Sequence, residues 1–262
     1  MGHQRLGKIP KSSKWAAVVD RVVSGTGLAR GDVDRIAALT LEAAGPALEK
    51  AKDDVGLRHT FYLLTQIVLA ARQPDWRGRL ADAGIALSAE ASIYDLTTGL
   101  QCAVDDHVAQ HGRPTDISEM AQQAAGEALT SLAGNDATTL FGSGGEYLQS
   151  AIRGLSTKSG VSRLGQTFFG RVLTRFLNFY LSRITATHAG SERLPSVGEV
   201  SQFNAALQTH CQQSARIVRD FCGHWYSKTE YVEGISPENT SRFMAVALGK
   251  LSRELAKQGA EG

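Results

Sequence analysis

The sequence contains little proline and few cysteines, and this excludes some classes of protein. Only six prolines and three cysteines occur in 262 residues. Cys102, Cys211 and Cys222 show no framework spacing, and an odd number fits reduced thiols better than a secreted disulfide fold. The basic N-terminal segment has no apolar core, so we do not expect a signal peptide. These absences predict a cytoplasmic protein.

Long apolar runs are also missing. The longest clean run, residues 61–71, contains Thr65 and Gln66 and is too short to span a bilayer, so we expect no contact with a membrane. No run of alternating β-branched residues is long enough to predict a sheet. The Ala-, Arg- and Gly-rich composition is typical of a bacterial gene, and the small net charge of +2 implies no partner by itself.

Helical periodicity is present along most of the chain. Apolar residues recur at a spacing near 3.6, and scarce proline favours long helices. We therefore predict an all-α, compact multi-helix globule of about nine or ten helices with no significant sheet. The expected helices cover residues 14–24, 33–52 with a bend or split at Pro46, 57–72, 75–83, 89–111, 116–133, 145–155, 161–187, 198–226 and 237–257.

The chain is predicted to form a single helical domain over residues 1–262. Turn residues at 188–197 mark the one candidate for a weak division. The apolar faces of the helices on both sides favour packing into one body. Residues 1–11 are expected to form a flexible basic tail.

The charged residues are divided by sign. Residues 89–146 contain nine acidic side chains and one basic side chain, whereas residues 147–191 contain six basic side chains and no acidic one. In the helix at 161–187, Arg171 and Arg175 lie opposite the apolar stripe, so we expect both to point away from the core with no carboxylate beside them. An arginine fork matches phosphate oxygens.

This pattern predicts a surface that contacts nucleic acid or another polyanion through the basic helix face at 153–183. The proposed phosphate contacts are Arg153, Lys158, Arg163, Arg171, Arg175 and Arg183, with Lys8, Lys11 and Lys14 of the tail. Two alternatives remain open. The basic and acidic segments can neutralise each other inside one fold. They can also serve as complementary surfaces, acidic at 89–146 and basic at 147–191, in a homo-oligomer or a protein–protein adaptor.

Two histidines are weak candidates for metal binding. His107 and His111 lie one helical turn apart and can face one point. Val108 stands where a metalloprotease has its glutamate, and the sequence indicates no third ligand. A histidine in the last turn of a helix is also favoured by the helix dipole alone. A metal-dependent hydrolase is therefore the least favoured function, and we expect no cofactor.

A final candidate lies around residues 223–228. Gly223 is predicted to end a helix, so that Trp225, Tyr226 and Lys228 follow on its exit as a stacking or docking group. The alternative is a hydrophobic clip that closes the last helices onto the core. Cys211 and Cys222 are expected to be packed as small hydrophobic residues. With no nucleotide-binding or catalytic motif in a suitable context, the sequence favours a non-enzymatic helical binding or assembly subunit.

Overall fold

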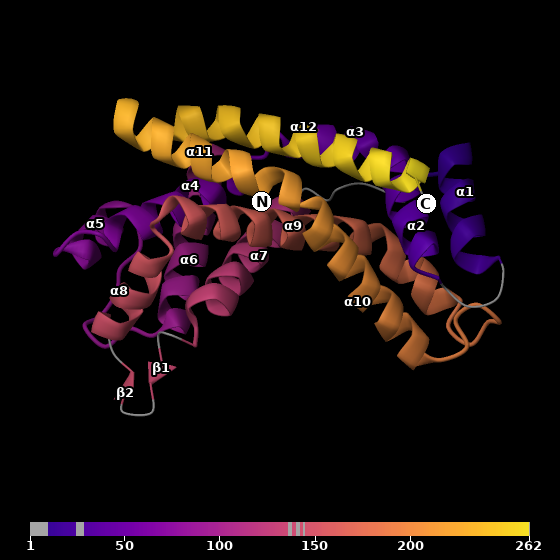
Figure 1. Cartoon of the computed structure of the whole chain (residues 1–262), viewed down its shortest axis with the longest axis horizontal. Coiled ribbons are helices and arrows are strands. Elements are labelled where there is room, and N and C mark those ends of the chain that lie inside the picture. The colour runs from indigo at the N-terminus through magenta and orange to yellow at the C-terminus, as the bar shows by residue number, and fades with distance from the viewer. Residues whose placement is uncertain (1–9, 25–28, 136–137, 140–141, 144, 262) are drawn as a thin grey trace.

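The computed structural model describes residues 10–24, 29–135, 138–139, 142–143 and 145–261, and these residues form an all-α fold (Figure 1). Twelve helices lie in the described part of the chain: α1 (Ser13–Val23), α2 (Arg30–Ala43), α3 (Gly45–Ala51), α4 (Val55–Ala70), α5 (Trp76–Asp82), α6 (Ile93–His111), α7 (Asp116–Ala133), α8 (Gly145–Gly154), α9 (Lys158–Thr187), α10 (Val197–Ser214), α11 (Arg216–Val232) and α12 (Pro237–Glu261). Between α7 and α8, β1 (Thr138–Thr139) pairs antiparallel with β2 (Gly142–Ser143), and Thr138 lies opposite Ser143.

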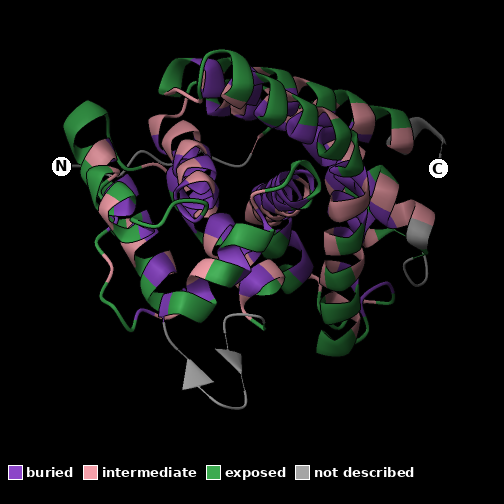
Figure 2. Cartoon of the chain, turned by 60° about the vertical axis from the view of Figure 1, so that its left-hand side comes forward, coloured by how far each residue is buried: buried purple, intermediate pink, exposed green. Residues whose placement is uncertain are grey.

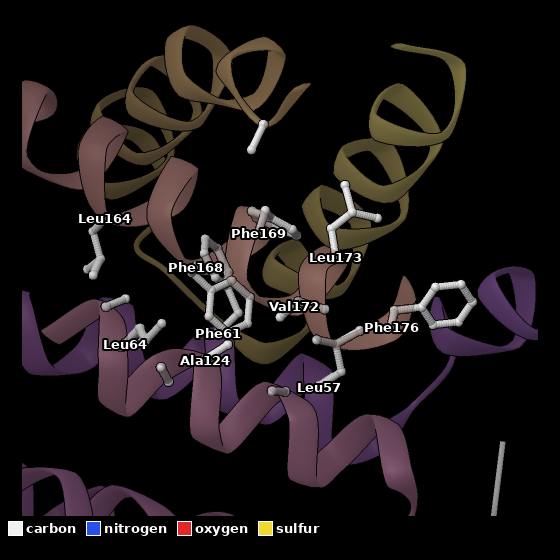
Figure 3. Packing of buried hydrophobic residues seen from close by; sticks show 14 of the residues in the cluster. Leu57, Phe61, Leu64, Ala124, Leu164, Phe168, Phe169, Val172, Leu173 and Phe176 are labelled. Carbon is white, nitrogen blue, oxygen red and sulfur yellow. The ribbon is translucent and has the colours of Figure 1, made fainter. Parts of the chain in front are cut away.

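The long helix α9 is the centre of the molecule. Its N-terminus is capped by Thr157, whose hydroxyl accepts a hydrogen bond from the Gly160 N–H at 3.0 Å. Seventeen of its thirty residues are buried, because α7, α10 and α11 all pack along it. Figure 2 shows the buried faces of the surrounding helices turned inward. At the middle of the core, Phe61 of α4 lies against Phe168 and Phe169 of α9, with ring centroids 5.4 and 5.3 Å apart (Figure 3).

Two of the predicted helices, 33–52 and 198–226, are divided in the structure, and this raises the number of described helices above nine or ten. Ala44 separates α2 from α3 next to Pro46, as expected from the proline. Ala215 separates α10 from α11, where neither glycine nor proline marks a break. Both α10 and α11 contact α9, while α10 also contacts α2 and α11 contacts α12. Packing against different neighbours therefore determines this break, which local sequence does not indicate.

The segment at 188–197 is tied to the N-terminal helices. Arg193 is buried, and its guanidinium donates to the Ser24 carbonyl oxygen and lies 3.1 Å from an Asp32 carboxylate oxygen. Leu194 is fully buried beside it. Asp32 also pairs with Arg21 at 2.7 Å and accepts a hydrogen bond from the Ala29 N–H at the start of α2. The buried, charged side chain of Arg193 therefore anchors the segment to α1 and α2.

Candidate binding groove between α11 and α12

Arg171 and Arg175 do not form the free cationic stripe that the helical periodicity predicts. Arg171 lies 3.1 Å from Glu127 of α7, and Arg175 donates to the other oxygen of the same carboxylate and to Gln123 Oε1. Both arginines are largely covered. The prediction that no carboxylate accompanies them is wrong, because α9 is central and α7 covers its polar side. One glutamate of the acidic segment therefore holds two arginines of the basic segment.

The other predicted phosphate contacts are spread over the molecule. Four basic side chains of the 153–183 segment are exposed: Arg153, Lys158, Arg163 and Arg183. Lys158 and Arg183 are twenty-five positions apart on α9, about 38 Å at 1.5 Å per residue. In the predicted tail, Lys11 is exposed and Lys14 pairs with Glu42 at 2.8 Å, while Lys8 lies outside the described residues. The predicted contacts among the described residues lie in or just before α1, in α8 and in α9, and their role in binding a polyanion stays a prediction.

The two candidate metal ligands are joined by a third histidine that the sequence did not indicate. His107 stacks on His111, with ring centroids 4.2 Å apart, and on His59 of α4 at 3.6 Å. Burial, and then the neighbouring imidazoles, lower the pKa of His59 to about 4. Parallel stacked rings do not direct their nitrogens at one point. Within the described residues, no group of three or more His, Cys, Asp or Glu side chains is arranged to hold a metal ion.

Trp225 and Tyr226 lie inside α11, and the prediction that the helix ends at Gly223 is wrong. Gly223 is the point where α11 approaches α9: a Cβ there would meet the Ser162 hydroxyl and lie 2.6 Å from the Lys158 carbonyl oxygen. Tyr226 is buried, its hydroxyl donates to the Ser156 carbonyl oxygen, and burial raises its pKa to about 12. The Tyr226 side chain is therefore not accessible to a binding partner.

Trp225 faces the opposite direction, toward α12, and lies in an open groove. The groove has a volume of about 520 Å³ and is lined by Phe221, Trp225, Thr229, Glu233, Asn239, Arg242, Phe243 and Val246. Its floor is the Trp225 ring stacked on Phe243, with centroids 4.3 Å apart, and Phe221 lies 5.3 Å from Phe243. Val246 forms one wall and is 52% exposed. An apolar surface of this kind, open to water, is a feature of binding sites.

Basic side chains lie beside this apolar floor, together with the Glu233 carboxylate, which also lines the groove. The Lys250 ammonium lies 5.4 Å from the centre of the Phe221 ring, Arg242 lines the groove, and Lys228 is exposed on α11. Over residues 216–257 seven Lys or Arg side chains are exposed, against three exposed carboxylates, those of Asp220, Glu233 and Glu238. The hairpin of α11 and α12 therefore presents a positive field to solvent.

Sequence reasoning identified only Trp225 and Lys228 of this surface. Phe221 precedes Trp225 by one helical turn, and Phe243, Val246 and Lys250 share one face of α12. These spacings indicate two amphipathic faces, but nothing local indicates that the two faces adjoin. The sequence predicts that this helix ends at residue 226, whereas α11 continues to Val232.

Cys211 of α10 and Cys222 of α11 are buried as expected and contact separate parts of α9, whereas Cys102 is exposed. Burial raises the pKa of Cys211 to about 12 and also raises the pKa of Cys222. Cys222 donates weakly to the Val161 carbonyl oxygen at 3.7 Å, whereas Cys211 is hydrogen-bonded to the Thr174 side chain. Both side chains therefore pack in the core as small hydrophobic residues.

Comparisons with protein-family models, with curated proteins and with solved structures each find no match for this chain. Among the described residues, no helix has both the length and the apolar character that crossing a bilayer requires.

Proposed function

We propose that this chain is a non-enzymatic binding subunit that recognises a protein partner through the groove between α11 and α12. The partner presents an amphipathic helical surface with apolar side chains along one stripe and carboxylates beside it. The observation that carries the proposal is the solvent-open apolar lining of Phe221, Trp225 and Val246 beside the cations of Arg242 and Lys250. Helix-in-groove recognition uses an apolar stripe for affinity and the flanking charges for orientation.

The ring contacts favour a protein helix over stacked nucleic-acid bases. Trp225 is already stacked on Phe243, and the Phe221 ring is approached by Lys250. Base stacking needs a free aromatic face. Aliphatic and aromatic side chains of a helix need only an apolar floor and walls, which this groove supplies. The sequence-based expectation of nucleic-acid binding stays a prediction, and the experiment below includes it.

The test is titration with a synthetic twenty-residue amphipathic peptide that has leucines at i, i+3, i+4 and i+7 and glutamates on both flanks. A twin with lysine in place of glutamate is the matched control, and a single-stranded oligonucleotide is the third probe. The readout is tryptophan emission, because Trp15 and Trp76 are buried and Trp225 is half-buried in the groove.

The acidic peptide is expected to shift the emission of the wild type, and the Trp225→Phe variant should bind it without that shift. Added salt should weaken the binding, because the flanking contacts are between charges. The proposal is wrong if the lysine twin binds equally well, or if only the oligonucleotide binds.

A further inference from the structure

The exposed face of α6 carries an aromatic side chain and carboxylates, which suit the aromatic floor of the groove and the cations beside it. Its exposed side chains are Tyr94, Asp95, Thr98, Cys102, Asp105, Asp106, Ala109, Gln110 and His111. Tyr94, the second residue of α6, is 68% exposed, which is high for an aromatic side chain. No Lys or Arg occurs between residues 93 and 111. This face therefore combines one aromatic anchor with three carboxylates.

We infer that the partner of the groove is a second copy of this chain, which docks the exposed face of its α6 onto α11 and α12. The inference rests on the proposed function, since it names the occupant of the same groove. A symmetric contact of groove against groove is disfavoured, because it brings together two surfaces that each carry an excess of cations. The contact between groove and α6 joins opposite charges.

The spacing of side chains along the two surfaces agrees. Asp105 and Asp106 lie eleven and twelve residues after Tyr94, about 17 Å along α6. On α12, Lys257 lies eleven residues after Val246, again about 17 Å, with Arg253 one turn nearer. With Tyr94 seated beside Val246, the two aspartates therefore lie opposite the second half of α12, where the Arg253 side chain is exposed.

The two surfaces lie on opposite sides of the molecule. Figure 1 shows α6 below α4 and the α11–α12 hairpin above it, and α4 contacts both α6 and α12. A molecule cannot place its own α6 on its own groove in this arrangement. Each added copy leaves one α6 face and one groove unused, so the contact is head to tail and continues beyond a dimer.

The experiment uses two full-length variants, each altered on one surface. The groove variant is Val246→Asp with Lys250→Glu, and the α6 variant is Tyr94→Ser with Asp106→Lys. Both alter exposed positions, and circular dichroism with a thermal midpoint verifies that each variant folds. Light scattering measures the mass of the wild type, of each variant and of their equimolar mixture across a hundredfold range of concentration.

The wild type is expected to grow beyond twice the monomer mass as concentration rises, and to dissociate in high salt. Each variant alone is expected to remain monomeric. Their mixture is expected to form a species of twice the monomer mass and nothing larger, because one intact α6 face meets one intact groove. A monomeric wild type, self-associating single variants, or a mixture that stays monomeric each overturns the inference.

The acidic peptide separates this inference from the proposed function. It binds the α6 variant, whose groove is intact, if the proposed function holds. Peptide binding together with a monomeric wild type leaves the groove as a site for another protein and removes the second copy as its occupant. If the acidic peptide binds neither the wild type nor either variant, both proposals are contradicted.

Discussion

The Trp225 indole lies on the Phe243 ring, with centroids 4.3 Å apart and ring planes 24° apart. This pair joins α11 to α12 and forms the floor of a groove whose wall, Val246, is half-exposed. Aromatic pairs contribute about 1 kcal/mol beyond the burial of their area. The contact thus stabilises the hairpin and keeps an apolar surface in contact with water, where a partner can cover it.

Substitution of Val246 by aspartate is expected to weaken binding of the acidic peptide while leaving the fold intact. A carboxylate on the wall opposes the carboxylates of the peptide and removes apolar contact, and a loss of about 2 kcal/mol is roughly thirtyfold in Kd. Fluorescence titration measures the change. Val197→Asp is the matched control, since Val197 is 80% exposed on α10, away from the groove. Equal affinity in the two variants would contradict the position of the site.

The Glu127→Gln variant is expected to unfold at lower urea concentration than the wild type. Glu127 is the shared partner of Arg171 and Arg175, so its neutralisation leaves two partly covered cations with weaker acceptors. Because all three side chains retain some contact with solvent, the expected loss in the free energy of unfolding is about 1 kcal/mol. Glu90→Gln, at an exposed position, is expected to change it by less than about 0.5 kcal/mol.

Replacement of Arg193 by methionine is expected to loosen the segment at 188–197 from α1 and α2. The change removes the contacts to the Ser24 carbonyl and to Asp32. Breaking a buried charged contact costs about 3 kcal/mol, and equilibrium denaturation measures that loss. The same substitution at Arg183, which is exposed, serves as control. A loss no larger than in the control would show that Arg193 does not anchor the segment.

Two glycines should respond to alanine in opposite directions. Gly223→Ala places a methyl group against the Ser162 hydroxyl and 2.6 Å from the Lys158 carbonyl oxygen, so α11 must move away from α9. We expect it to destabilise the protein by about 2 kcal/mol. Gly249 lies within α12 with nothing within 4 Å of an added Cβ, so Gly249→Ala should stabilise it by about 0.5–1 kcal/mol. Thermal denaturation distinguishes the two outcomes.

The histidine stack predicts that stability falls in mild acid. The pKa of His59 is about 4 in the folded chain and 6.5 in its ordinary state, so the unfolded chain binds its proton first as pH falls. The contribution of neutral His59 to the free energy of unfolding is therefore fully present above pH 6.5. It decreases as pH falls toward 4, by about 2 kcal/mol after allowance for the partial exposure of the ring.

The measurement is urea denaturation across that pH window. His59→Gln should flatten the decrease between pH 6.5 and 4, whereas His224→Gln, at an exposed position of α11, should leave it in place. An unchanged pH dependence in His59→Gln would assign the acid sensitivity to other groups.

The all-α class and most helix positions follow from the sequence because they depend on local periodicity and caps. Ser12 caps α1, Pro46 lies at the start of α3, and Pro237 begins α12, as their residue types predict. The break at Ala215 and the passage of α11 through Gly223 were not predictable. Contacts between helices decide both, and local propensity does not predict such contacts.

The candidate site likewise depends partly on local sequence and partly on tertiary contacts. The sequence places Arg171 and Arg175 on a polar stripe, but it does not show that Glu127, more than forty residues earlier, lies against them. It also draws attention to Trp225 without showing that Phe243 and Val246 complete a groove. Residue type and spacing predict an amphipathic face, whereas the neighbour of that face depends on the tertiary fold.

The most direct test of the central claim is the change in tryptophan emission when the acidic peptide is added. The proposed groove predicts a saturable shift in the wild type, absent in Trp225→Phe and weakened about thirtyfold in Val246→Asp. The lysine twin should produce no shift. A shift that persists in Trp225→Phe, or equal responses to the acidic and basic peptides, would contradict recognition of an acidic helix at α11 and α12.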